Sequence, residues 1–127
     1  MDKKEKSMKT TKADFKAFKR ECRKWIKFWG LNNWEVHYIH ESINGTARCI
    51  MKLSGYTATI VLAKTIRKKY YTRKYILQCA FHEVCELLLG RFNINAQSRF
   101  IAGNEIEESS HEVIRILENV IYRKGNK

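Results

Sequence analysis

The stretch YILQCAFHEVCELLL, residues 75–89, decides both the fold and the chemistry of this chain. Its apolar residues surround nearly the whole circumference of the helix that it predicts, and such a helix is normally buried on most of its sides. Three polar residues interrupt the apolar surface, His82, Glu83 and Glu86. Because a polar group in a buried helix destabilises the protein unless it is paired or bound to a ligand, these residues are the candidates for a functional site.

The spacing of His82 and Glu86 predicts a metal site. Residues four apart on a helix project from the same face, so the imidazole and the carboxylate can reach one ion. Such a pair suits a first-row metal, zinc above all, although a mixed nitrogen and oxygen set also accepts manganese or iron. Glu83, turned by about 100° from His82, is placed to act as the base beside a metal-bound water. The alternative is a His82–Glu86 hydrogen bond that only fixes the packing of the helix.

A catalytic zinc site needs a third protein ligand and one open position. We expect that ligand on the last helix, whose start is predicted by a capping box over residues 104–107. The capping box already employs Glu107, which makes His111 the first choice for the third ligand and Glu107 the second. Cys79, three residues before His82 on the same face, is a more distant candidate. The sequence does not choose which of three tyrosines reaches the site to bind a developing oxyanion: Tyr70, Tyr71 or Tyr75.

The segments around this helix predict one α+β domain. Apolar residues at spacings of three and four predict an amphipathic helix over residues 11–29. Alternating segments separated by short turns predict a three-stranded antiparallel meander, with strands at residues 34–40, 47–53 and 56–62. The expected order is an N-terminal helix, the meander, the buried metal-site helix and, after a loop over residues 91–103, a C-terminal helix. Residues 1–10 are expected to form a flexible basic arm, and residues 11–124 a single domain.

The composition excludes several classes of protein. A chain of 127 residues with 44% apolar residues can build a single core. No apolar run approaches the roughly 20 residues that span a bilayer, so no membrane partner is expected. The basic N-terminus lacks the apolar segment of a secretion signal. We therefore expect a cytoplasmic protein with reduced thiols at its four cysteines, Cys22, Cys49, Cys79 and Cys85.

The net charge of +12 is unevenly distributed along the chain. Residues 1–27 and 64–74 are strongly basic, whereas residues 83–118 contain seven Glu against three Arg. Aromatic residues lie among the cations, a combination that suits single-stranded nucleic acid, although the solvated face of a small protein has the same composition. Binding of this kind is non-specific and weakens with salt. The candidate contacts are Lys24, Lys27, Arg67, Lys68, Lys69, Arg73 and Lys74.

The order of these segments resembles the small SprT-like metallopeptidases of bacteriophages and prophages, which have the zincin fold. The resemblance covers residues 13–122 and is carried by the WEVHY and TATIVL strands and by the HEVCELLL and HEVIRILE helices. It implies zinc-dependent hydrolysis, with strand 56–62 at the sheet edge along the substrate cleft, and the host cytoplasm as location if a phage encodes the chain. The family motif is H-E-x-x-H with a carboxylate from a later helix. Here Glu86 replaces the second histidine, and His111 stands near the expected carboxylate.

Two functions follow from these observations. The first is a zinc metallopeptidase, in which His82, Glu86 and His111 hold the metal and Glu83 takes the proton from the attacking water. Its substrate would be a protein or peptide, including one attached to nucleic acid. The alternative is a non-catalytic binding protein on the same scaffold, which engages nucleic acid or an acidic host protein through its positive surface.

Overall fold

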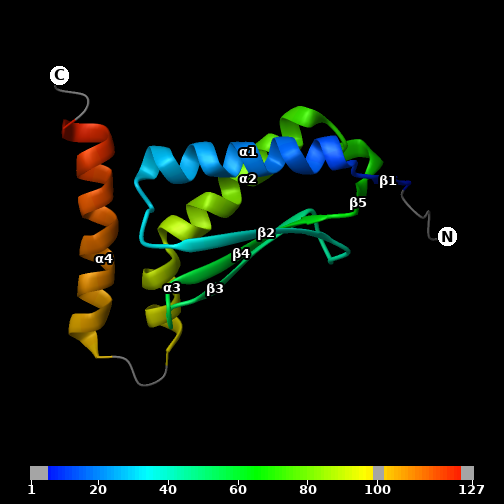
Figure 1. The fold of residues 1–127 in the computed structure, drawn as a ribbon. Coiled ribbons are helices and arrows are strands. Elements are labelled where there is room, and N and C mark those ends of the chain that lie inside the picture. The colour runs from blue at the N-terminus through cyan, green and yellow to red at the C-terminus, as the bar shows by residue number, and fades with distance from the viewer. Residues whose placement is uncertain (1–5, 99–101, 124–127) are drawn as a thin grey trace.

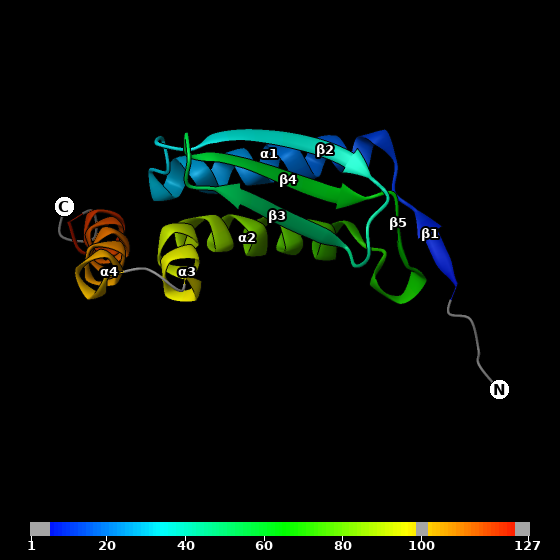
Figure 2. The same ribbon diagram turned by 90° about the horizontal axis from the view of Figure 1, so that it is seen from below.

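The computed structural model describes residues 6–98 and 102–123. Helices α1 and α2 lie over one face of a three-stranded sheet, as Figures 1 and 2 show. A small two-stranded sheet, β1 and β5, lies at one end of the molecule, and helices α3 and α4 lie at the other. The predicted α+β class is therefore confirmed. None of the helices in the described ranges combines the length and the apolar character that a membrane span needs.

Helix α1 spans Lys12–Trp29, as the apolar periodicity predicts. Its start is fixed by a capping box, in which Thr11 and Asp14 each accept a hydrogen bond from the other's backbone N–H. Its end is fixed by Gly30, whose left-handed conformation at φ 69° favours a residue without a side chain. The apolar face buries Phe18 and Cys22 completely.

The three-stranded sheet contains β2 (Glu35–Glu41), β3 (Ala47–Lys52) and β4 (Thr57–Ala63) in the order β2-β4-β3. Strand β3 pairs antiparallel with β4, but β2 pairs parallel with β4, so that Tyr38 lies opposite Ile60. The predicted antiparallel meander is therefore wrong. Short turns indicate which strands follow each other, whereas burial decides which strand is central. Strand β4 is the most buried of the three and takes the central place, and β3 becomes the edge strand beside α2.

The predicted flexible arm is wrong for its last residues. Strand β1 (Ser7–Lys9) pairs antiparallel with β5 (Thr65–Arg67), and the short helix η1 (Lys68–Tyr70) follows. Thr10 is buried, and its hydroxyl donates a hydrogen bond to the carbonyl of Ala63. Residues 7–9 form a strand because they pair with backbone groups of β5 that would otherwise lack hydrogen-bond partners. Residues 1–5 lie outside the described residues.

Helix α2 spans Arg73–Leu88, close to the predicted 75–89. It packs against α1 and β3 and buries Ile76, Ala80 and Val84 completely. The residues 90–97 are not part of a loop, because they form α3 (Gly90–Gln97). Helix α4 (Gly103–Leu117) begins after Ala102 without a side-chain cap, so the predicted capping box is wrong, and a π-helical turn, η2 (Glu118–Arg123), continues it. Residues 99–101 lie outside the described ranges.

Candidate functional site

The structure brings together the three polar residues of α2. One ligand atom from each of His82, Glu83 and Glu86 lies within 4.8 Å of the other two. His82 Nε2 and Glu86 Oε2 are 3.1 Å apart. Two ligands of one tetrahedral zinc ion are about 3.3 Å apart, given bond lengths near 2.0–2.1 Å. The separation of His82 Nε2 and Glu86 Oε2 is therefore close to that of two ligands of one zinc ion.

Glu83 is the buried member of this group. Glu83 is 5% exposed, and its Oε1 has no hydrogen-bond partner among the described residues. The pKa of Glu83 is raised to about 7, chiefly by burial and also by the charge of Glu86, whereas His82 opposes the shift. A carboxylate with a pKa near neutrality can both accept and return a proton at the pH of a cell, as a general base must.

His82 and Glu86 are not buried, in contrast to the prediction from the apolar surroundings in the sequence. Their side chains are 68% and 46% exposed. Their hydrogen bond exists, as the alternative interpretation predicts, but an exposed pair of this kind stabilises a helix by only about 0.3–0.5 kcal/mol. It cannot fix the packing of a core from which both side chains are absent. It also leaves the burial of Glu83 without an explanation.

The third ligand predicted on the last helix is not brought to this group. His111 and Glu107 are exposed on α4, and neither belongs to the set of neighbouring ligand atoms around His82. Helix α4 packs against α3, beyond the end of α2 (Figure 1). The described arrangement therefore supplies metal donors from α2 alone. Cys79 is likewise outside the group, and burial raises the pKa of its thiol.

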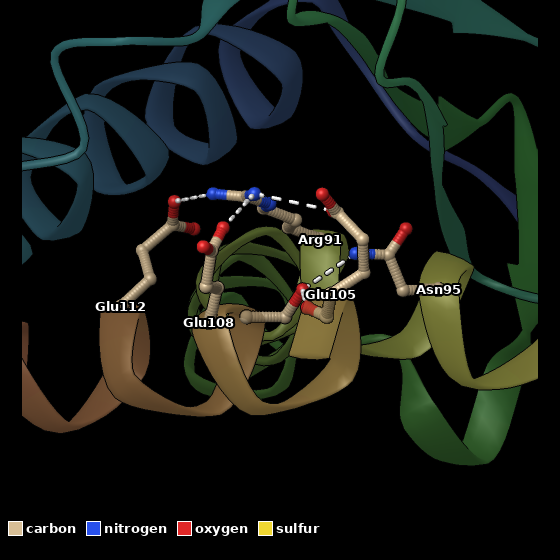
Figure 3. Close-up of polar contacts among 6 residues, drawn as sticks. Arg91, Asn95, Glu105, Glu108 and Glu112 are labelled. Carbon is tan, nitrogen blue, oxygen red and sulfur yellow. Dashed lines mark hydrogen bonds and ion pairs between the residues drawn. The ribbon is translucent and has the colours of Figure 1, made fainter. Parts of the chain in front are cut away.

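A cluster around Arg91 fixes the position of α4. The guanidinium of Arg91 lies 3.3–3.5 Å from carboxylate oxygens of Glu105, Glu108 and Glu112, as Figure 3 shows. Below it, Asn95 Nδ2 donates a buried hydrogen bond to Ser109 Oγ. Three of the acidic residues of this region are therefore engaged with α3. Sequence reasoning missed this cluster because it assigned residue 91 to a loop.

A cavity of about 450 Å³ opens beside the α2 site. It lies between α2 and the N-terminal end of β3, so β3, and not the central strand β4, borders the site. This corrects the expectation that strand 56–62 is the edge along the cleft. Of the three candidate tyrosines, Tyr75 lines this cavity, whereas the Tyr71 hydroxyl donates to Asp14. The lining residues are Gly45, Thr46, Ala47, Tyr75, Gln78, Cys79, His82 and Glu83.

The candidate nucleic-acid contacts are divided between two ends of the molecule. Lys24 and Lys27 lie in the last turns of α1, and the other five lie on β5, η1 and the start of α2, at the opposite end (Figures 1 and 2). Within the described residues, Arg73 pairs with Asp14 and Lys24 pairs with Glu21. The candidate contacts therefore do not form one continuous track.

Comparison of the chain with protein-family models, with curated proteins and with solved structures finds no match. The likeness to SprT-like metallopeptidases stays a prediction drawn from the motif and the order of the segments. A function for this chain must therefore be inferred from the chemistry of the α2 site.

Proposed function

We propose that this protein is a metal-dependent peptidase of the zincin type. In it, His82 and Glu86 hold a divalent cation, zinc first among the candidates, and Glu83 is the general base. The observation that carries the proposal is the buried Glu83, whose Oε1 finds no hydrogen-bond partner in the part of the chain that the structure describes, although two side chains able to bind a metal lie beside it.

The donor set fits such a cation. An imidazole nitrogen and a carboxylate oxygen 3.1 Å apart are ligand types that zinc accepts. A buried carboxylate that lacks a partner destabilises the fold when it is charged, and a neighbouring cation offsets that penalty. The same fit holds for manganese or iron, because nitrogen and oxygen donors discriminate weakly among these metals.

In this proposal, the bound ion supplies Lewis acidity and lowers the pKa of a water molecule. Glu83 accepts the proton of the attacking water and returns it to the amine that leaves when the peptide bond breaks. Tyr75, on the wall of the same cavity, is the candidate donor to the developing oxyanion. Strand β3 lies at an edge of the sheet, where its backbone groups are the candidates to pair with an extended protein substrate.

Metal analysis tests the proposal directly. Protein purified without added metal should contain close to one equivalent of zinc by mass spectrometry, and a peptide library should be cleaved. His82→Ala and Glu86→Ala should lose the metal, whereas Glu83→Gln should keep it. His111→Ala is the matched control, because it removes an exposed imidazole that lies outside the group of neighbouring ligand atoms.

Three outcomes would change the interpretation. A wild-type protein that binds no zinc, manganese or iron, and whose unfolding ignores a chelator, would refute the metal site. Metal bound by the wild type but retained in His82→Ala would place the ion elsewhere. Loss of zinc in His111→Ala would show that α4 supplies the third ligand in solution, in an arrangement that differs from the present one.

One observation favours the second candidate, a non-catalytic binding protein on the same scaffold. Catalytic zinc sites usually have three protein ligands in addition to a base. Within the described residues, α2 provides two exposed ligands and, as the base, one buried carboxylate. A third protein ligand is therefore missing from this group. Metal binding without hydrolysis of any peptide in the library would support this candidate.

A further inference from the structure

The three-stranded sheet has one face that no helix of the described residues covers. Successive side chains of a strand point to opposite faces of its sheet. The face toward α1 and α2 carries Tyr38, Cys49 and Ile60, which belong to the core or pack against it. Figure 2 looks onto the opposite face, where the strands lie in front of the helices. We call this opposite side the outer face.

The strand register arranges the side chains of the outer face in rows. Each row crosses β2, β4 and β3 in that order, and neighbouring strands are about 4.8 Å apart. Three complete rows follow from the two registers: Glu35, Thr57 and Lys52; His37, Thr59 and Ile50; Ile39, Val61 and Arg48.

The middle of the outer face is apolar and β-branched. Ile39 and Ile50 are 41% and 47% exposed. Val61, on the central strand, is buried although it does not belong to the core cluster beneath the helices. A sheet face that stays in water is normally polar, whereas apolar residues mark the face that packs on something. The centre of the outer face therefore suits contact with another apolar surface.

The charged residues of the outer face are separated by strand. Glu35 and Glu41 are exposed on β2, and Arg48 and Lys52 are exposed on β3. These two acids balance the two cations, although the whole chain has a net charge of +12. Two copies of the chain therefore repel each other less across this face than across their basic surfaces, and a polyanion gains no net attraction here.

A two-fold axis parallel to the central strand would bring opposite charges together. Such an axis places β2 of one copy on β3 of the other and keeps the rows in line, so that Glu35 faces Lys52 of the second copy. Sheets packed in this aligned way are about 10 Å apart, within reach of two long side chains. An axis across the strands would instead place β2 on β2 and β3 on β3, with like charges together.

We propose that a second copy of this chain docks on the outer face and forms a two-fold dimer with the two β4 strands facing each other. Val61 and Thr59 lie next to the axis, and the two isoleucines of each copy surround them. Three short strands offer less than the roughly 800 Å² that each partner of a stable complex buries, so we expect a weak dimer, with a Kd on the order of 10–100 µM. The proposal does not depend on the metal site of α2.

Sedimentation velocity of the full chain tests the dimer. The average mass of the wild type should rise from that of one chain toward that of two between about 5 and about 500 µM protein, at about 150 mM salt. Ile50→Lys removes an exposed apolar residue and adds a like charge to each copy, so this variant should remain a monomer over the same range.

Charge exchange tests the proposed axis. Lys52→Glu sets two carboxylates against each other twice in the dimer, and it should raise the Kd about tenfold, as should Glu35→Lys. The variant that carries both substitutions restores opposite charges and should return to within about threefold of the wild-type Kd. Lys27→Glu is the matched control, because it makes the same change of charge on α1, on the covered side of the sheet, and should not raise the Kd.

The substituted side chains are exposed, so the variants should fold, which circular dichroism checks. The Glu35–His37 ion pair that Glu35→Lys removes is exposed at both ends and contributes little stability. Three results would overturn the proposal: a wild type that stays monomeric, an equal loss in Lys27→Glu and Lys52→Glu, or a double variant as weak as the single ones. A monomeric wild type would leave the outer face to a different protein.

Discussion

Two carboxylates in this molecule are buried to the same degree and have opposite surroundings. Asp14, in the first turn of α1, and Glu83, in the middle of α2, are each 5% exposed. The Asp14 carboxylate accepts hydrogen bonds from the Thr11 backbone N–H, the Tyr71 hydroxyl and the Arg73 guanidinium, at 2.7–3.2 Å. Glu83 Oε1 accepts none from any described residue.

The difference in partners reverses the effect of burial on the pKa. Burial by itself would raise the pKa of Asp14, but the hydrogen bonds from Thr11, Tyr71 and Arg73 outweigh it and lower the pKa below its usual value. Burial raises the pKa of Glu83 to about 7 because no such bonds oppose it. A buried carboxylate with all its partners holds the fold together, whereas one without them is available for chemistry.

The largest effect is expected when the proposed general base, Glu83, is removed. Glu83→Gln keeps the size of the side chain but cannot accept a proton, so peptide hydrolysis should fall by about 10²–10⁴-fold. Initial rates on the cleaved peptide measure the effect. Asp14→Asn, assayed below its melting temperature, should keep the wild-type rate. Equal losses in the two variants would erase the distinction between the two carboxylates.

The same substitution, Glu83→Gln, should increase the stability of the metal-free protein at high pH. Because the folded-state pKa of Glu83 is raised from 4.5 to about 7, the wild type loses stability as the pH rises between these values. Above pH 7 the charged, buried Glu83 lowers the free energy of unfolding by about 3 kcal/mol. Glu83→Gln should largely remove this loss. Urea unfolding in the presence of a chelator, at pH 4 and pH 8, measures this. A variant that is no more stable than wild type at pH 8 would contradict the raised pKa.

Asp14→Asn should destabilise the protein by about 2 kcal/mol at pH 7, since the variant loses charge-assisted hydrogen bonds and the capping box. The pKa of Asp14 is lowered in the folded state, so its contribution is present above the unfolded-state pKa, near 3.8, and disappears as the pH falls through the folded-state pKa. The gap between wild type and variant should therefore close below pH 4 in urea titrations. Glu107→Gln, at an exposed carboxylate, is the control and should leave stability unchanged.

The smallest effect is expected where carboxylates are paired but exposed. Arg91→Gln removes the contacts to Glu105, Glu108 and Glu112, whose side chains are 22–62% exposed. The loss of stability should be about 0.5–1 kcal/mol and should shrink in high salt. Thermal unfolding at two salt concentrations measures it. A loss as large as that of Asp14→Asn would show that exposure does not separate these two classes of ion pair.

The local parts of the fold could be predicted from the sequence. Apolar periodicity places α1 and α2, and alternation places the three strands of the sheet within one or two residues. Spacing along a single helix also brings His82, Glu83 and Glu86 together, because their relative positions depend on helix geometry alone.

The non-local parts could not be predicted, for identifiable reasons. The parallel pairing of β2 with β4 joins strands that are not consecutive, so no turn signal reports it. The sequence predicts a loop from residue 91 onward, yet Gly90 begins α3. An added Cβ there would lie 2.5 Å from Met51 Sδ, and this close approach explains the glycine. The chain reaches His111 through α3. Because the sequence predicts a loop where α3 lies, it also predicts the wrong position for His111, the expected third ligand.

The pairing of β1 with β5 has a consequence for the synthesis of the protein. The ribosome makes Ser7 long before its partner Arg67, so the N-terminal strand has no partner until the sheet behind it has been translated. Ser7 also lines the hollow of about 510 Å³ beside β5. The wall of this hollow is therefore complete only after both β5 and the first strand are in place.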